Sequence, residues 1–147
     1  MTPPEFILRN LREEDYDALV ELWNASGSGF QVQGRERGEA ISRHLTQFAH
    51  LSFAAVSGDR FVGTVLGTHD GRKGWINRLA VRPEFRRKGV AAALVKACDA
   101  AIRREGIEIV AALVESDNHA STALFRKLGY SDAIEVRYFR NFCHEQA

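Results

Sequence analysis

The sequence contains little cysteine, little proline and almost no net charge. Cys98 and Cys143 are its two cysteines, too few for a disulfide framework, and no C-x-x-C or Cys/His cluster points to a metal site. Its 20 Lys and Arg residues nearly balance 19 Asp and Glu residues, for a formal charge of +1. A binder of nucleic acid would usually carry a clear positive charge. We therefore expect no metal and no nucleic-acid partner.

Long apolar runs are also missing from the sequence. None approaches the roughly 20 residues that a membrane-spanning helix needs. The first residues include acidic side chains, where a signal peptide would need a basic start and then an apolar stretch. These absences predict a cytoplasmic protein in a reducing compartment, without a membrane partner.

The composition is that of an ordinary globular protein, with 45% hydrophobic and 27% charged residues over a length of 147. We expect a single domain spanning residues 1–147. Hydrophobic periodicity predicts a mixed α/β fold in the order β-α-α-β-β-β-α-β-α-β. The expected strands are 6–11, 51–56, 60–68, 75–81, 107–114 and 134–142, and the expected helices are 12–24, a segment around 41–48, 90–105 and 118–128. The strand at 107–114 is the most continuously apolar, as for a strand covered on both faces.

The segment with the clearest chemistry runs from Leu79 to Leu94. A strand leads into a basic loop, and the loop opens a helix at Gly89. Four basic residues and one acidic residue between Arg82 and Lys88 give this stretch a local charge of +3. Unpaired N–H groups and the helix dipole favour phosphate at a helix N-terminus. The pattern is neither a Walker loop nor a dinucleotide fingerprint, and taken alone it also fits a solvated corner with surface arginines.

This loop is the first of two sequence motifs that follow one another along the chain. The first runs from the apolar triplet at Leu79 to R-x-x-G-x-A at 86–91, and the second runs from Asn118 to Gly-Tyr at 129–130. In these blocks the sequence resembles the GNAT superfamily of acyl-coenzyme A N-acyltransferases, over nearly the whole chain. The resemblance implies a GNAT-like mixed sheet whose central parallel strands splay apart around the cofactor, acetyl-CoA.

The resemblance also implies roles for individual residues. The backbone of the triplet would bind the pantetheine arm, and the N–H groups of the basic loop would surround the pyrophosphate. Asn118 would approach the cofactor where the strands splay, a role compatible with capping a helix. The N–H of Val81 would stabilise the developing oxyanion. The implied cofactor-binding residues are Leu79, Ala80, Val81, Arg86, Arg87, Lys88, Gly89, Val90, Ala91, Asn118 and Phe125.

The sequence departs from the family at the proton-transfer groups. Phe125 stands where many members carry a tyrosine acid, so it cannot donate a proton. Helical spacing places Ala120, Ala123, Leu124 and Leu128 on one apolar face and Phe125 at its edge, where it either lines the cofactor cleft or packs peripherally. Water or Tyr138 would then supply the proton.

The sequence also leaves more than one candidate for the general base. Some relatives place a glutamate near the position of Trp75, and others near Leu113. Glu115 is two residues after Leu113 and on the same strand face, which makes it the best single candidate. An exposed carboxylate at a strand end is the plainer interpretation, and His119 is a further candidate. Cys98 lies on a buried helical stripe, where packing rather than nucleophilic chemistry is expected.

These features predict an acetyl-CoA-dependent N-acetyltransferase that transfers the acetyl group directly to a primary amine, chiefly by proximity and orientation. The alternative is a GNAT-like acyl-CoA sensor or interaction module without turnover. The acceptor is a small-molecule or peptide amine of a kind the sequence does not specify. The acceptor-side loop is expected at 24–34, with Trp23, Phe30 and Arg35 as contacts. The resemblance is compatible with a homodimer.

Overall fold

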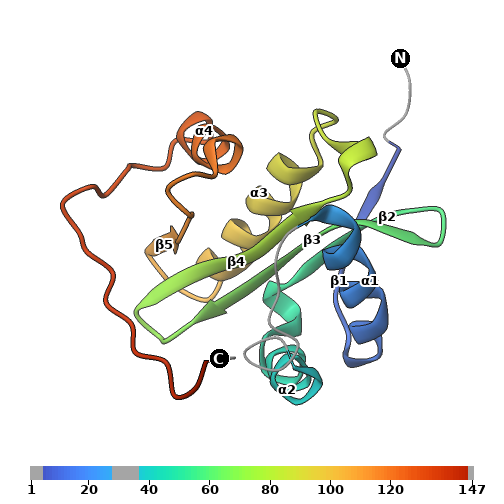
Figure 1. The fold of residues 1–147 in the computed structure, drawn as a ribbon, viewed down its shortest axis with the longest axis horizontal. Helices are drawn as coiled ribbons and strands as arrows, with labels where there is room; N and C mark the ends of the chain where they lie inside the picture. The colour runs from blue at the N-terminus through green and yellow to red at the C-terminus, as the bar shows by residue number, and fades with distance from the viewer. Residues whose placement is uncertain (1–4, 28–36, 146–147) are drawn as a thin grey trace.

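Five strands form one sheet in the order β1-β2-β3-β4-β5, with helices on both faces (Figure 1). The computed structural model describes residues 5–27 and 37–145. The strands are Ile7–Asn10 (β1), Phe53–Ser57 (β2), Arg60–His69 (β3), Lys73–Val81 (β4) and Ile109–Ala112 (β5). The α-helices are Tyr16–Ser26 (α1), Gly38–Phe48 (α2), Val90–Arg103 (α3) and His119–Lys127 (α4). Short 3-10 turns lie at Glu13–Asp15, Ala49–Leu51 and Pro83–Phe85.

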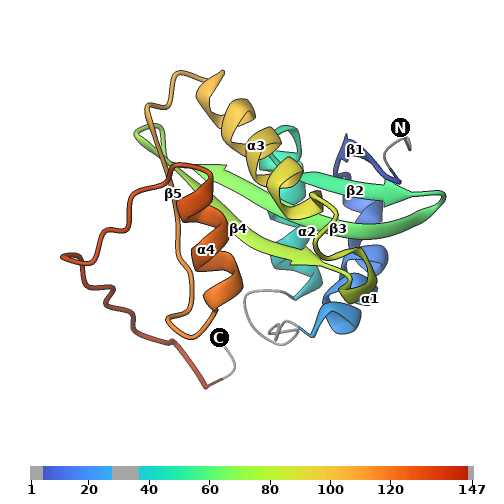
Figure 2. The same ribbon diagram turned by 90° about the horizontal axis from the view of Figure 1, so that it is seen from above.

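The helices divide the molecule into layers. Figure 1 shows α3 and α4 on one face of the sheet and α1 and α2 on the other, and Figure 2 shows the same layers from above. Each layer buries its own hydrophobic cluster: Leu94 and Ile102 of α3 belong to the first, and Leu19 and Trp23 of α1 to the second. The apolar stripes expected from sequence on α1 and α3 are thus the buried faces of these two helices.

Helix α3 approaches the sheet closely through glycines. A Cβ atom on Gly67 would lie 2.7 Å from Cys98 Sγ, and one on Gly74 would overlap Ile102 Cγ2. Neither contact is tolerable for a real side chain, so these glycines permit the close approach. This contact fixes α3 over β3 and β4, and with it the loop that enters α3.

The central strand β4 changes its partners along its length. It pairs antiparallel with β3, with a register irregularity opposite 64–66, and Arg78 has a φ of 50° beside it. Its parallel pairing with β5 runs from Lys73↔Ile109 to Ile76↔Ala112, while β4 itself continues to Val81. Within the described part of the chain, no strand pairs with the end of β4 on the β5 side, and this end of β4 is called its free edge below.

Most of the elements predicted from sequence are confirmed, including the mixed α/β class and the alternation up to α4. The loop expected from residue 24 begins later, because Ala25 and Ser26 complete α1; positions 28–34 of that loop lie outside the described residues. No helix in the described part of the chain is both long and apolar enough to cross a membrane.

Three expectations about the C-terminal third are wrong. Strand β5 is short, and Ile109 within it and Leu113 directly after it are 56% and 57% exposed. Among the described helices, none covers the other face of the sheet at β5 (Figure 1). Residues 134–142 adopt no strand in the structure. On α4, Phe125 is the buried residue while Ala120 and Ala123 are exposed, because α4 meets α3 through its aromatic side.

Candidate active site

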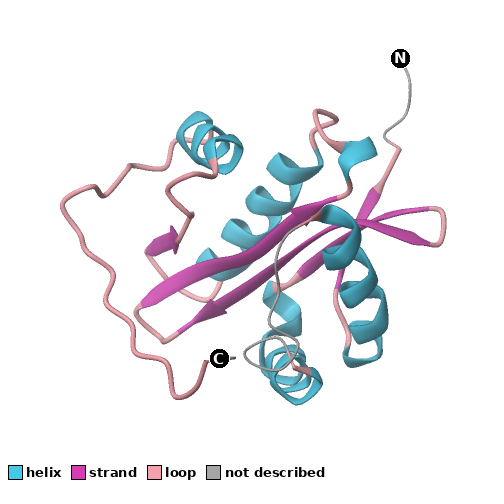
Figure 3. Ribbon diagram, in the orientation of Figure 1, coloured by secondary structure: helices cyan, strands magenta, loops and turns pink. Residues whose placement is uncertain are grey.

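A loop with two left-handed residues connects β4 to α3. Arg87 has a φ of 63° and Gly89, the N-cap of α3, a φ of 83°. Figure 3 shows this loop between the strand and the helix. The first N–H groups of a helix have no partner within it, and left-handed turns of this type direct successive N–H groups into a concave anion site. The loop therefore has the geometry to bind a phosphate group.

The basic side chains of the loop have different roles. The Arg86 guanidinium donates to the carbonyl oxygen of Ser26 at 2.9 Å. Lys88 pairs with Glu5 at 2.8 Å and lies 5.1 Å from the centre of the Phe85 ring. Arg86, Arg87 and Lys88 are all exposed, so their positive charge surrounds the start of α3.

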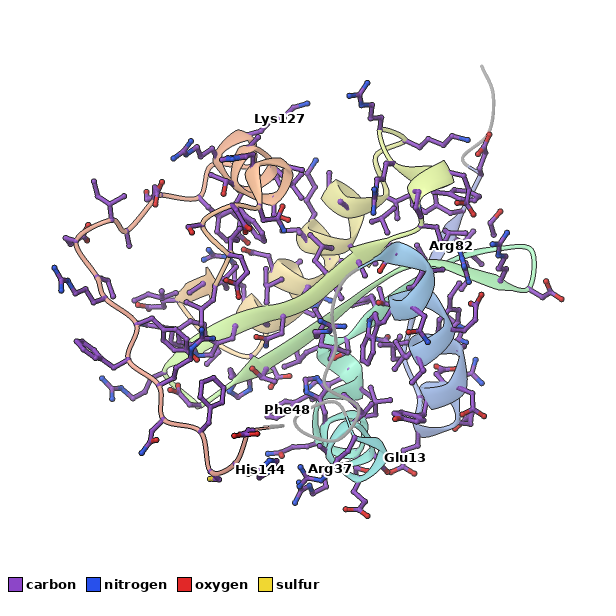
Figure 4. The ribbon with its side chains drawn as sticks, in the orientation of Figure 1. Glu13, Arg37, Phe48, Arg82, Lys127 and His144 are labelled. Carbon is purple, nitrogen blue, oxygen red and sulfur yellow. The ribbon has the colours of Figure 1, made fainter. Side chains whose placement is uncertain are left out.

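Arg82, which contributed to the expected basic patch, is instead a structural residue. It is 1% exposed, its Nε donates to the Phe61 carbonyl oxygen at 2.6 Å, and its guanidinium pairs with Glu21 of α1. Figure 4 shows Arg82 beside α1 at the end of β4. The hydrogen bond from Arg82 lowers the pKa of Glu21. The exposed patch consequently begins at Arg86, and Arg82 joins the strand end to α1.

The free edge of β4 lies next to this loop. The N–H of Arg82 donates to the Val62 carbonyl oxygen at 2.9 Å, towards β3. Because backbone groups alternate along a strand, Leu79 and Val81 direct their N–H and C=O groups the other way, to the edge that β5 leaves open. Ala80 lies two residues before Arg82, so its own backbone groups face β3 as those of Arg82 do. The edge thus offers two residues for an added extended chain.

The residues expected around the base lie where β5 ends. Asn118 caps α4, with its side-chain oxygen accepting the Ser121 N–H at 3.0 Å. The Glu115 carbonyl oxygen accepts the Asn118 N–H at 2.9 Å, and the side chains of Glu115 and His119 are exposed. The capping role predicted for Asn118 is confirmed. The turn brings these residues together at one end of β5.

Phe125 packs in an aromatic cluster between α4 and α3. Its ring meets Tyr130 edge-on at 5.1 Å between centroids, and the Tyr130 hydroxyl donates to the Asp99 carboxylate. Burial, followed by the Asp99 hydrogen bond, raises the pKa of Tyr130. Burial also raises the pKa of Cys98 to about 12, so this thiol stays protonated and packs as a small hydrophobe. Sequence reasoning missed the Tyr130–Asp99 pair, although Tyr130 ends the second motif.

Trp23 is not available as an acceptor contact. It is 0% exposed, and the Arg78 guanidinium covers its ring at 4.6 Å from the ring centre. The expectation was wrong because the helical spacing that suggested a position near the loop also places Trp23 on the core stripe of α1. Phe30 and Arg35, the other two expected contacts, lie outside the described residues.

The histidines lie away from the β4–α3 loop. His44 is hydrogen-bonded to Ser52 Oγ at 3.2 Å, and burial lowers its pKa to about 4. His50 and His69 both contact Glu105, at 2.5 Å and 2.9 Å, beyond the C-terminal end of α3. Within residues 5–27 and 37–145, no group of three or more His, Cys, Asp or Glu side chains is arranged to hold a metal ion.

A cavity of about 1210 Å³ lies beside β5. It is bounded by β5, by α3 and α4, including Phe125, and by Val136 and Tyr138 of the C-terminal segment. Its lining does not include the β4–α3 loop. The cavity and the anion-binding loop are therefore different features, and Phe125 belongs to the lining of the cavity.

Known proteins match both the sequence and the fold. Residues 9–130 match the family described as Acetyltransferase (GNAT) family. Acetyltransferase plu1384 of Photorhabdus laumondii is 30% identical over 125 residues, covering 85% of this chain and 86% of that protein. Acetyltransferase ECA0875 of Pectobacterium atrosepticum is 29% identical over 123 residues, covering 84% and 86%.

A solved structure shows the same fold. The PaiA N-acetyltransferase from Thermoplasma acidophilum, in complex with coenzyme A, superposes with a TM-score of 0.77 at 18% identity, covering 89% of this chain and 91% of that one. At that identity the likeness concerns the fold alone. The family match includes β4, the loop between β4 and α3, and helix α4 with its Asn118 cap. The chain therefore belongs to the GNAT acetyltransferase family and is an acyltransferase.

Proposed function

We propose that this protein transfers the acetyl group of acetyl-CoA to a primary amine. The observation that carries the proposal is the free edge of β4 at Leu79 and Val81, placed directly before a loop that presents helix N–H groups. An extended pantetheine arm can pair with such an edge, and a pyrophosphate fits such a loop. The complex of PaiA N-acetyltransferase with coenzyme A supports a ligand of this kind.

The loop passes a simple steric test for the pyrophosphate. Apart from Gly89 and its two chain neighbours, no atom of the described residues lies within 4 Å of the position where a Cβ on Gly89 would be, so the turn is open for close approach. We assign the N–H groups of 87–91 to the pyrophosphate, and the charges of Arg86, Arg87 and Lys88 to its surroundings. Leu79 and Val81 bind the pantetheine arm, and Ala80 connects them to β3 through its pairing with Thr64. Asn118 and Phe125 form the opposite wall of the cofactor site.

Bound acetyl-CoA would supply an activated thioester carbonyl and a good leaving group. The Val81 N–H, directed to the free edge, would stabilise negative charge on that carbonyl oxygen. The remaining task is to hold a neutral amine beside the carbonyl, which is a matter of proximity and orientation. Phe125 donates no proton, so water or Tyr138 would protonate the departing sulfur.

Glu115 is our candidate for the base. It lies in an exposed segment after β5, and because β5 ends at Ala112 the strand face expected for Leu113 and Glu115 does not reach them. A free alkylamine has a pKa of roughly 10 and is mostly protonated at neutral pH, so a nearby carboxylate would help to remove the proton, directly or through water. His119, which follows Glu115 by four residues, is the second candidate for the base.

The test is release of free thiol from acetyl-CoA in the presence of a panel of primary amines, including peptides with a free N-terminus. Steady turnover with at least one amine is the expected result. Tight binding of coenzyme A without turnover on the whole panel would instead favour the acyl-CoA sensor, a function that the absence of a tyrosine at position 125 keeps open. A protein that neither binds coenzyme A nor turns over would contradict the proposal.

A further inference from the structure

Arg82 makes hydrogen bonds in four directions at the point where β4 ends. Its N–H donates to the Val62 carbonyl oxygen at 2.9 Å, and its own carbonyl oxygen accepts the Phe85 N–H at 2.9 Å. Its Nε donates to the Phe61 carbonyl oxygen at 2.6 Å, and its guanidinium pairs with Glu21 of α1. This residue therefore joins β3, α1 and the first turn of the anion-binding loop at the end of β4 (Figure 4).

The side chain of Arg82 is buried although it is charged. It is 2% exposed, whereas the Glu21 side chain is 60% exposed. Removing a guanidinium from water is unfavourable, and a buried pair often contributes little net stability. Loss of one partner is strongly unfavourable, because it leaves the other charge buried without compensation. Without Glu21, we therefore expect the guanidinium to turn towards water and to release its hydrogen bond to β3.

Val81 lies between two residues whose backbone groups face β3. Because Ala80 and Arg82 direct their N–H and C=O groups to β3, those of Val81 point to the free edge. Pro83 restricts the residue before it to an extended conformation, and Arg82 has a φ of −56° and a ψ of 140°. The direction of the Val81 N–H therefore depends on how firmly its neighbours are held.

We propose that Arg82 is a positioning residue for acyl transfer, which holds the Val81 N–H where negative charge develops by joining the end of β4 to β3 and to Glu21. A hydrogen-bond donor stabilises that charge best when it is already in place. A displacement of about 1 Å can lower the rate by about a hundredfold. The anchoring is independent of any substrate, whereas the part played by the Val81 N–H rests on the proposed function.

Hydrogen exchange of the full-length protein tests the anchoring without a substrate. Glu21→Ala removes the partner of the guanidinium and leaves Arg82 itself unchanged. The Arg82 amide, which donates to Val62, should then exchange at least about tenfold faster than in the wild-type protein. Asp17→Ala is the matched control and should not change this exchange, because Asp17 is an exposed acidic residue one turn earlier on the same side of α1. Unchanged exchange of the Arg82 amide in Glu21→Ala would overturn the anchoring.

Initial-rate kinetics test the role in acyl transfer, with an amine that the protein acetylates and at a temperature at which circular dichroism shows every variant to be folded. Glu21→Ala should lower kcat at least about tenfold, with a much smaller change in both KM values. Glu21→Gln keeps an oxygen that accepts a hydrogen bond from the guanidinium, so it should retain most of the activity. A role in stability alone would leave the kcat of the folded variants unchanged.

A second variant tests whether Arg82 and Glu21 act as one unit. Arg82→Met removes the guanidinium and should lower kcat about as much as Glu21→Ala does. Residues that act through one interaction are not additive, so the double variant should be no slower than the single variants. Additive losses would overturn the shared role, and if Arg82→Met does not fold, Glu21→Ala and Glu21→Gln decide the proposal.

The remaining outcomes separate this role from others at the site. An unchanged kcat in folded Glu21→Ala would overturn the positioning role even where exchange confirms the anchoring. A rise in both KM values without loss of kcat would also overturn it, because that result would place Arg82 in substrate binding. Absence of turnover by the wild-type protein with every amine would contradict the proposed function and the positioning role together, and exchange would still decide the anchoring.

Discussion

The Arg86 guanidinium donates to the Ser26 carbonyl oxygen at 2.9 Å, across 60 residues of sequence. Arg86 opens the anion-binding loop, and Ser26 is the last residue of α1, directly before the segment expected to contact the acceptor. One side chain therefore connects the donor side of the proposed site to its acceptor side.

We predict that Arg86→Gln weakens the binding of both substrates, acetyl-CoA and the amine. The variant loses a charged hydrogen bond to the end of α1 and a positive charge beside the pyrophosphate. Loss of a charge-assisted bond of this kind corresponds to roughly tenfold in affinity. Initial-rate kinetics should show a higher KM for acetyl-CoA and for the amine. Arg87→Gln is the matched control, which should raise the KM for acetyl-CoA alone; equal behaviour of the two variants would rule out the connecting role.

We predict that Gly89→Val abolishes tight binding of coenzyme A. Gly89 has a φ of 83° and open space where a side chain would begin, so a valine is strained by about 1–2 kcal/mol and occupies the position assigned to phosphate. Gly106→Val is the matched control, because Gly106 has a φ of 85° at the other end of α3. Calorimetry should show loss of affinity in the first variant only. Normal affinity in folded Gly89→Val would disprove the assignment of the loop.

We predict that Phe125→Tyr retains or increases turnover, because it places a phenol hydroxyl, which can donate a proton, at this position. Phe125→Ala should lower the free energy of unfolding by about 3 kcal/mol, the usual scale for emptying a buried aromatic site, since Phe125 is only 8% exposed. Denaturant titration measures the second effect and thiol release the first. A tyrosine variant that binds coenzyme A normally and has no turnover would mean that the thiol lies elsewhere.

We predict that stability falls below pH 6.5 through His44. Burial lowers its pKa from 6.5 to about 4, so the unfolded chain binds a proton that the folded chain excludes. The stabilisation is complete above pH 6.5 and is lost by about 1.4 kcal/mol per pH unit as the pH falls towards 4. Denaturant titrations at several pH values should show a shallower decline in His44→Gln. The same slope in both proteins would contradict this account.

We predict that Glu115→Gln lowers kcat/KM by roughly a hundredfold, the usual scale for a positioned base. Higher pH should partly restore the rate, because solvent then deprotonates more of the amine. The affinity for coenzyme A should not change, since its contacts are assigned to other residues. His119→Gln is the control for the second candidate. A wild-type pH–rate profile in Glu115→Gln would exclude this carboxylate as the base.

The sequence by itself determined the features that depend on neighbouring residues. The basic loop around Gly89, the Asn118 cap and the helical stripe of α3 follow from local geometry: a glycine where φ is positive, an acceptor at a helix start and a spacing of three to four residues. These are the features by which the family could be recognised. They position the donor side of the proposed site.

Tertiary structure alone decided the features that depend on distant partners. Arg82 looked like part of an exposed basic patch, but it is buried against Glu21, 61 residues away. Phe125 looked peripheral on its own helix, yet Tyr130 and α3 bury it. Trp23 belongs to the hydrophobic core, because Arg78 and the sheet cover its ring. Whether a side chain faces solvent, a partner or a ligand depends on which elements pack against it, and no local pattern contains that information.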